Sequence, residues 1–306
     1  MRIVITGPTG AIGHALIEKC IKNNDEVLAI CHRGSQRIKT IPDNPSVKIL
    51  ELDLSDYLAF SKNYDNSLGK YDMFYHFAWG FTTGDGRNNI EQQSLNIQYA
   101  INAVKLANAF GCKIFVGAGS QAEYGRVEGL LKPDTPVHPE NGYGIAKLCA
   151  GQLTRILCLQ LGIRHIWTRI LSVYGPFDGE GTLIISSLRK MLIGDDIPLT
   201  KGEQVWDFVY SSDAANAMYL LGTKGIDGKT YVIGNGKADI LKNYIITMKE
   251  KSLSDSLLKF GAIPYSKKQV MHLCADISEL TKDTGFYPEV SFEEGIIKTI
   301  DYLKGV

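Results

Sequence analysis

Short apolar runs alternate with longer amphipathic segments over the first half of the chain. The runs are rich in Val, Ile, Leu and aromatic residues, which is typical of buried parallel strands. They lie at residues 2–6, 26–31, 47–52, 73–78, 113–119 and 165–171. Residues 10–23, 88–110 and 143–161 carry apolar side chains at the i, i+3, i+4 spacing of helices. This alternation predicts an α/β fold with a doubly wound parallel sheet of the Rossmann type.

The pattern loosens after Gly175 and Pro176, where helical segments are shorter and Gly, Pro and Lys are more frequent. Residues 208–222 and 231–234 are expected to return to the sheet. We therefore predict a dinucleotide-binding domain of residues 1–174 that also receives residues 206–238. Residues 175–205 and 239–306 are expected to form a smaller, mixed α/β substrate-binding region over the strand ends, where open α/β sheets bind ligands.

Composition narrows the class of protein. The 306 residues are 44% hydrophobic and 22% charged, with 33 basic and 33 acidic side chains. Zero net charge argues against a nucleic-acid or membrane-surface partner. The six cysteines are scattered without metal-ligand spacing, so no metal is expected. Without a signal-peptide pattern or an apolar run near the ~20 residues of a membrane span, we expect a cytoplasmic protein.

A spaced glycine triplet follows the first predicted strand and precedes the first helix. Glycines in this context allow a tight turn and close approach of the backbone to a pyrophosphate, which the helix N-terminus stabilises. The loop therefore predicts dinucleotide binding. The residues expected to take part are Gly7, Thr9, Gly10, Ala11, Ile12 and Gly13.

The end of the second strand bears on the choice of cofactor. An acidic residue there usually accepts a hydrogen bond from the ribose 2′-hydroxyl of NAD. Here Cys31 takes that place and is followed by His32 and Arg33, whose guanidinium can pair with a 2′-phosphate. We therefore predict NADP as the preferred cofactor, with NAD possible.

The third and fourth strands add further cofactor contacts. Asp53 either accepts a hydrogen bond from the adenine amino group or serves as a turn or cap residue, and its sequence context leaves both open. The remaining predicted contacts are Leu54 beside it and Phe77 and Ala78 after the fourth strand.

Tyr143 and Lys147 lie four residues apart at the start of a predicted helix, so their side chains share one face. Taken alone, the pair is either ordinary surface chemistry or half of a proton-transfer site. A tyrosine with a pKa near ~10 is a poor acid or base at neutral pH, and a nearby ammonium favours its phenolate.

Several ordered motifs now set this pair in context. They include TGPTGAIG at 6–13, HFAWG at 76–80, GAGSQAEYG at 117–125, YGIAK at 143–147, RILSVYGP at 169–176 and WDFVYSSDAANA at 206–217. With these motifs the chain resembles the extended short-chain dehydrogenase/reductase family, in its branch acting on nucleotide-activated sugars. The resemblance covers essentially the whole chain.

The resemblance implies roles for individual residues. Tyr143 would exchange a proton with the substrate oxygen while the nicotinamide exchanges hydride at the same carbon. Lys147 would hold the nicotinamide ribose and depress the pKa of Tyr143, and Ser120 would donate a hydrogen bond to the same oxygen. A homodimer through the helices at about 88–110 and 141–160 is also implied.

Two reactions of the branch look absent from the sequence. Its 4,6-dehydratases carry Asp-Glu directly after the catalytic hydroxyl residue, where this chain has Gln121 and Ala122, and the side chain of Glu123 is expected to point elsewhere. Its epimerase-reductases need a cysteine and a histidine at positions that are Ala122 and, after the YGP turn, Phe177 and Asp178 here. Dehydration and that epimerisation are therefore not expected.

Two activities remain, a 4-ketoreductase using NADPH and a 4-epimerase that retains NAD. The sequence at Cys31 and Arg33 favours the reductase. Our hypothesis is an NADPH-dependent reductase of a nucleotide-linked 4-keto-6-deoxyhexose in activated deoxysugar biosynthesis, as for a surface polysaccharide. A non-catalytic NAD(P)-binding regulatory protein is the alternative from another class, and a dehydrogenase of a small hydrophobic alcohol is a further alternative.

The diphosphate-binding arginines usual in the branch are missing. Trp206 and Ser266 stand at their positions, and Ser172 replaces an asparagine. A lysine can compensate only as a point charge, because it lacks the bidentate fork. The predicted substrate-binding residues are Trp79, Gln121, Ser172, Trp206 and Lys267.

Overall fold

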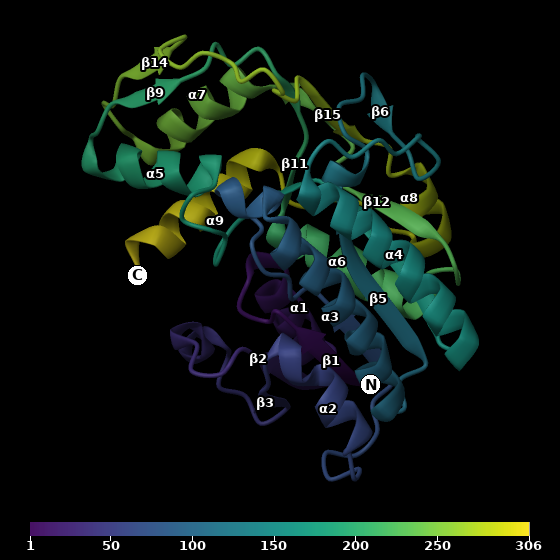
Figure 1. Cartoon of the computed structure of the whole chain (residues 1–306). Coiled ribbons are helices and arrows are strands. Elements are labelled where there is room, and N and C mark those ends of the chain that lie inside the picture. Colours follow the sequence, from purple (N-terminus) through teal and green to yellow (C-terminus); the bar gives the residue numbers. More distant parts are fainter. Residues whose placement is uncertain (306) are drawn as a thin grey trace.

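A parallel sheet forms the centre of the computed structural model, which describes residues 1–305 (Figure 1). Within those residues the sheet has seven strands in the order β3-β2-β1-β4-β5-β7-β12, and each neighbouring pair is parallel. The strands are β1 (Arg2–Thr6), β2 (Glu26–Cys31), β3 (Val47–Glu51), β4 (Met73–His76), β5 (Ile114–Ser120), β7 (Arg164–Ile170) and β12 (Thr230–Ile233). The strand order reverses between β1 and β4, as in a doubly wound Rossmann sheet, which confirms the predicted fold class.

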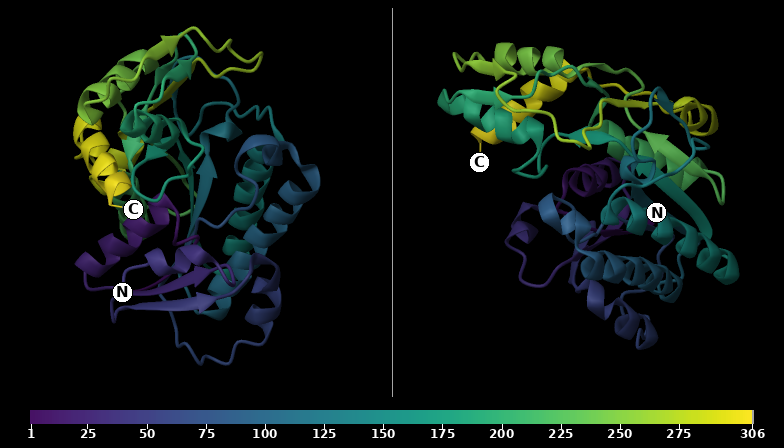
Figure 2. Two further views of the ribbon diagram at one scale, coloured as in Figure 1. Left: turned by 90° about the vertical axis from the view of Figure 1, so that its left-hand side faces the viewer. Right: turned by 45° about the horizontal axis from the view of Figure 1, so that its top comes forward.

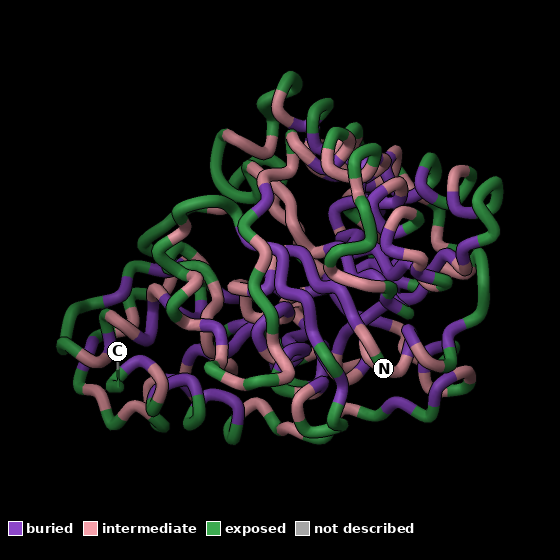
Figure 3. Tube along the Cα trace, turned by 90° about the horizontal axis from the view of Figure 1, so that it is seen from below, coloured by how far each residue is buried: buried purple, intermediate pink, exposed green. Residues whose placement is uncertain are grey.

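Helices cover both faces of this sheet (Figure 2). One face carries α1 (Ala11–Lys22), α6 (Ser211–Lys224) and α8 (Ser278–Thr284), and the other carries α2 (Tyr57–Lys62), α3 (Ile90–Ala109) and α4 (Gly142–Leu161). Alternate side chains of β1 enter opposite cores: Ile3 and Ile5 pack with Leu16 of α1, and Val4 packs with Val104 of α3. Buried residues are accordingly concentrated in the central strands (Figure 3).

Two expectations about strands are corrected. The run at 47–52 was expected to be buried, but β3 is an edge strand in which Lys48, Ile49 and Glu51 are exposed, because it has a neighbour on one side only. Residues 208–210 were expected in the main sheet, but β11 (Phe208–Tyr210) pairs with β8 (Ser172–Tyr174) in a separate two-stranded sheet. Residues 231–234 behave as predicted, since β12 joins β7 in the main sheet.

The C-terminal part forms a smaller lobe (Figure 1). Its own apolar core joins α5 (Leu183–Ile193), α7 (Leu241–Ser252) and α9 (Phe292–Lys304), beside the strand pair β9 (Ile197–Leu199) and β14 (Leu258–Phe260). A further small sheet has the order β13-β10-β15-β6, with bounds Asp239–Ile240, Val205–Trp206, His272–Ala275 and Leu130–Leu131. Since β6 comes from the first half of the chain, this sheet ties the lobe to the Rossmann sheet. No helix among residues 1–305 has both the length and the apolar character that a membrane crossing requires.

Candidate active site

Tyr143 lies in the first turn of α4, whose start is fixed by its cap and by a close backbone contact. The cap residue Asn141 accepts a hydrogen bond from the backbone N–H of Gly144 at 2.8 Å. A Cβ atom at Gly144 would lie 2.3 Å from the carbonyl oxygen of Ala122, so only glycine allows α4 to come this near. The start of α4 therefore lies directly against the segment that follows Ser120.

Lys147 is held one turn further along the same helix. Its Nζ donates to the carbonyl oxygen of Ala118 at 2.6 Å and stands 3.8 Å from the ring centroid of Trp79. The same Nζ is 5.7 Å from the ring centroid of Tyr143. Burial lowers the pKa of Lys147 to about 7, although the carboxylate of Glu123 opposes this shift.

The pKa of Tyr143 is raised above its ordinary value, and burial is the largest cause. The neighbouring Ser120 hydroxyl and the charge of Arg87 act in the opposite direction, while Glu123 adds to the rise. The guanidinium carbon of Arg87 lies 4.4 Å from the centroid of the tyrosine ring. The role of Lys147 in lowering the pKa of Tyr143 stays a prediction.

Glu123 lies in a buried ion pair behind the site. One carboxylate oxygen, Oε1, accepts from the backbone N–H of Ser120 at 2.9 Å and from Nε1 of Trp167 at 3.0 Å. The other, Oε2, accepts from Nε of Arg169 at 2.9 Å. The side chain of Glu123 is fully buried, so it points elsewhere as the sequence predicted.

One cavity of about 760 Å³ joins the glycine loop to the C-terminal lobe. The predicted site residues that line it are Gly7, Gly10, Ala11, Ile12, Gly13, Phe77, Trp79, Ser120, Gln121, Tyr143, Lys147, Ser172 and Trp206. Those outside its lining are Thr9, His32, Arg33, Asp53, Leu54, Ala78 and Lys267. The three predicted catalytic side chains thus share one wall with the loop predicted to bind the dinucleotide.

The glycine loop fits a pyrophosphate. Gly7 has a φ of +68°, and a Cβ atom at Gly13 would lie 2.3 Å from the carbonyl oxygen of Gly7. A Cβ atom at Gly10 would meet nothing nearer than 3.8 Å, so this position opens onto the cavity. Because α1 begins at the next residue, its free N–H groups lie beside that opening.

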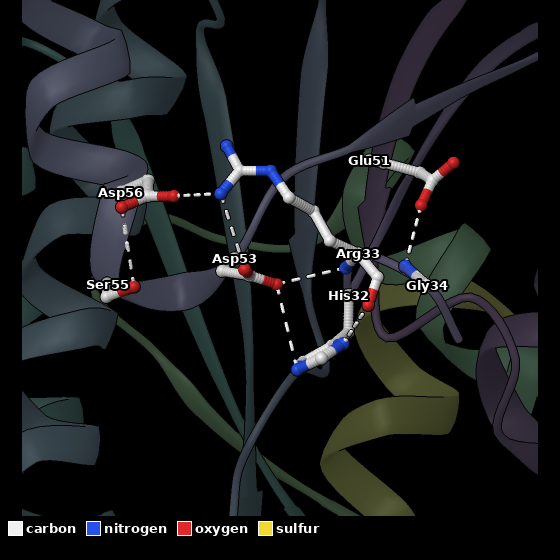
Figure 4. A network of polar contacts seen from close by, with 7 residues as sticks. All are labelled: His32, Arg33, Gly34, Glu51, Asp53, Ser55 and Asp56. Atoms are coloured by element: carbon white, nitrogen blue, oxygen red, sulfur yellow. Dashed lines mark hydrogen bonds and ion pairs between the residues drawn. The ribbon is translucent and has the colours of Figure 1, made fainter.

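At the end of β2, the side chain of Arg33 forms ion pairs with two carboxylates (Figure 4). The guanidinium of Arg33 pairs with Asp53 at 3.4 Å and also with Asp56. Asp53 accepts in addition from the backbone N–H of Arg33 at 3.0 Å, and the N–H of Gly34 donates to Glu51 at 2.8 Å. A 2′-phosphate would have to draw Arg33 away from these acids.

No Lys or Arg among residues 1–305 lines the lobe side of the cavity, and Asp178 is the one acidic residue of the lining. Nε1 of Trp206 donates to Oγ of Ser172 at 2.7 Å, so these two predicted substrate-binding residues are joined. Gln204 and Gln269, which the sequence did not single out, line the same region. Lys267 is exposed and lies outside the lining, so it does not supply a cation to this cavity.

Arg87 is the cavity residue that sequence reasoning missed. It lies in the short 3₁₀ helix η3 (Gly84–Asn88) between β4 and α3. Within residues 1–305, Arg87 and Lys147 are the only Lys or Arg side chains that line the cavity. Nothing in the sequence distinguishes Arg87 from a solvated loop residue.

No group of three or more His, Cys, Asp or Glu side chains in the described part of the chain is placed to hold a metal ion. The polar side chains that line the cavity include the phenol of Tyr143, the amine of Lys147, the hydroxyl of Ser120, the guanidinium of Arg87 and the carboxyl group of Asp178.

Known proteins with similar sequences and folds modify nucleotide sugars. A CDP-abequose synthase of Salmonella muenchen is 24% identical over 309 residues, covering 98% of this chain and 97% of its own. An uncharacterized UDP-glucose epimerase of Bacillus subtilis is 26% identical, covering 100% of this chain and 99% of its own. A crystal structure of UDP-glucose 4-epimerase with UDP-glucose from Thermotoga maritima superposes with a TM-score of 0.89 at 25% identity, covering 100% of this chain and 99% of that one.

The family model for the NAD dependent epimerase/dehydratase family matches residues 3–234, about the whole Rossmann part together with β12. This match confirms the resemblance predicted from the ordered sequence motifs. The chain belongs to the NAD dependent epimerase/dehydratase family.

Proposed function

We propose that the protein is an NADPH-dependent reductase of a nucleotide-linked 4-keto-6-deoxyhexose, acting in activated deoxysugar biosynthesis. The observation that carries the proposal is the convergence of Tyr143, Ser120 and Lys147 on one cavity that also reaches the glycine loop. Relatives named as a CDP-abequose synthase and as UDP-glucose epimerases support a nucleotide sugar as the substrate class.

The side chains supply the acid and the orientation that ketone reduction needs. When bound, the nicotinamide cofactor supplies the hydride. Tyr143 gives its proton to the ketone oxygen. Oγ of Ser120 accepts from the N–H of Ala122 at 3.2 Å, which leaves its own O–H free to donate to the same oxygen. Lys147, with its ammonium at the cavity wall, orients the nicotinamide ribose.

Reduction is favoured over dehydration by the three residues that follow Ser120. Expelling a hydroxyl group needs a proton donor and a base beside the sugar. Gln121 and Ala122 follow Ser120, and Glu123 is committed to Arg169 inside the protein. We therefore do not assign the activity of the dTDP-glucose 4,6-dehydratases that are among the relatives.

A 4-epimerase with tightly bound NAD is the second candidate, because one observation favours it. Asp53 and Asp56 already neutralise Arg33, and their carboxylates repel a 2′-phosphate. Such an enzyme would use Tyr143 as base and acid in turn at one carbon and would release no cofactor.

The reaction can be tested with NADPH and a panel of dTDP-, CDP-, GDP- and UDP-linked 4-keto-6-deoxyhexoses. We expect loss of NADPH absorbance with at least one of them. Tyr143→Phe should lower kcat by about 10²-fold or more, because it removes the proton donor. Cofactor affinity, measured by fluorescence titration, should stay the same.

Tyr287→Phe is the matched control, since Tyr287 is exposed and lies outside the cavity. This variant should keep full activity. Absence of NADPH oxidation with every sugar, or normal turnover by Tyr143→Phe, would contradict the proposed reaction.

Cofactor choice should depend on how Arg33 is shared between the acids and the 2′-phosphate. We expect kcat/KM to be at least about tenfold higher with NADPH than with NADH. Arg33→Ala should remove this preference, and Asp56→Asn should increase it by releasing the guanidinium. Steady-state kinetics with both cofactors measure these ratios; equal values in the unaltered protein would favour the NAD-retaining epimerase instead.

We also propose a homodimer through α3 and α4. On α4 the side chains of Ile145, Ile156 and Leu159 are 54%, 48% and 74% exposed, and on the adjacent α3 those of Ile90 and Leu95 are 65% and 42% exposed. Exposed large apolar side chains on two adjacent helices are what an interface would bury.

Introducing Arg at both Ile156 and Leu159 should convert the dimer to a monomer in light scattering, because two charges would be desolvated at the interface. Ile193→Arg, at a similarly exposed apolar position on α5, should leave the mass unchanged. A monomeric unaltered protein would refute the dimer.

A further inference from the structure

We propose that Arg87 is a positioning residue for the proton transfer: its guanidinium, held over the ring of Tyr143, stabilises the phenolate that this residue becomes. The inference rests on the proposed function, in which Tyr143 is the acid. It adds Arg87 to the electrostatic role that the sequence motifs assign to Lys147.

The loop that carries Arg87 is fastened to both neighbouring helices. Oδ1 of Asn88, the next residue, accepts from the backbone N–H of Gly142 at the start of α4 at 3.0 Å. Gln93, buried in α3, donates through Nε2 to the carbonyl oxygens of Phe81 at 2.9 Å and of Gly86, within η3, at 3.0 Å. These bonds fix η3 against the turn that holds Tyr143. The guanidinium is thus directed over the ring by the fold itself.

The guanidinium of Arg87 does not form an ion pair with a carboxylate of the described residues. Among the described residues, no carboxylate lies within ion-pairing distance of it, whereas Arg33, Arg126, Arg169 and Arg189 all have acidic partners. The side chain is half-buried at the cavity wall, where a charge is screened less than in open solvent.

Three charged groups face Tyr143: Arg87 from η3, Lys147 from α4 and Glu123 from η4 (Gln121–Glu123). Glu123 is neutralised by Arg169, whereas Arg87 and Lys147 each donate to a backbone carbonyl oxygen, that of Thr82 at 3.3 Å and that of Ala118 at 2.6 Å. Both basic groups therefore act on the phenol, and the nearer of the two is Arg87. Its carbon Cζ lies 4.4 Å from the ring centroid, nearer than the 5.7 Å of Lys147 Nζ.

The proposed reduction creates a negative charge at this ring. The O–H bond of Tyr143 breaks and a new O–H bond forms at the C4 oxygen of the sugar, while C4 accepts a hydride from NADPH. The electron pair of the broken bond stays on Tyr143 as phenolate until solvent returns a proton. A cation over the ring stabilises the phenolate more than the neutral phenol, and so lowers the free energy of proton release.

The test places 3,5-difluorotyrosine at position 143, so that the phenol titrates in an accessible pH range, and follows its ¹⁹F NMR signal with pH without added cofactor or substrate. Arg87→Gln should raise the pKa of this phenol by about one unit. Arg87→Lys should restore at least half of that shift. Arg155→Gln, which removes an exposed arginine from α4, the helix that carries Tyr143, should leave the pKa of the phenol unchanged.

An unchanged pKa in Arg87→Gln, or an equal rise in Arg155→Gln, would overturn the inference. In the protein with its natural Tyr143, Arg87→Gln should also lower kcat about tenfold with little change in KM. The titration requires no turnover. A protein that gives the expected pKa shifts but oxidises no NADPH with any 4-ketosugar would therefore refute the proposed function and leave the inference standing.

Discussion

The site depends on the buried ion pair between Glu123 and Arg169. An unpaired carboxylate in this interior would be strongly destabilising, so losing its partner would cost about 3–5 kcal/mol. Burial raises the pKa of Glu123, and Arg169 opposes that rise. The same carboxylate holds the backbone of Ser120 and the indole of Trp167, and so locks the ends of β5 and β7. One interaction thus fixes the backbone of Ser120, the proposed hydrogen-bond donor, and keeps the carboxylate of Glu123 inside the protein.

Charge is distributed unevenly along that cavity. Arg87 and Lys147 lie at the end that holds Tyr143, whereas Ser172, Trp206 and Gln204 line the lobe side, and Asp178 is the one acidic residue of the lining among residues 1–305. In the proposed reaction the two basic groups stand beside the tyrosine that loses its proton, and a nucleotide would be held mainly by hydrogen bonds and stacking. In the proposed reaction, Arg87 and Lys147 would stabilise the negative charge that develops on Tyr143 more than the charge already present on the nucleotide diphosphate. Groups that are fixed in place before the reaction lower a barrier in this way.

Hydrophobic periodicity and residue spacing were sufficient to predict the main sheet and the helix that carries Tyr143. Strand and helix periodicity gave the doubly wound sheet, and the spacing of Tyr143 and Lys147 placed both on one helical face. The burial of β3 was predicted wrongly, because an edge position is decided by strands elsewhere in the chain. The partners of Arg33 lie 20 or more residues away, and Arg87 reaches Tyr143 only because η3 is tied to α4. Such contacts arise from tertiary packing, which periodicity does not encode.

The most direct measurement is isotope transfer from NADPH carrying deuterium at the reactive position of its nicotinamide. With a nucleotide-linked 4-keto-6-deoxyhexose as substrate, product NMR should locate deuterium at C4 of the sugar, in an amount equal to the NADP formed. Deuterium absent from C4, or sugar conversion without release of NADP, would contradict the account.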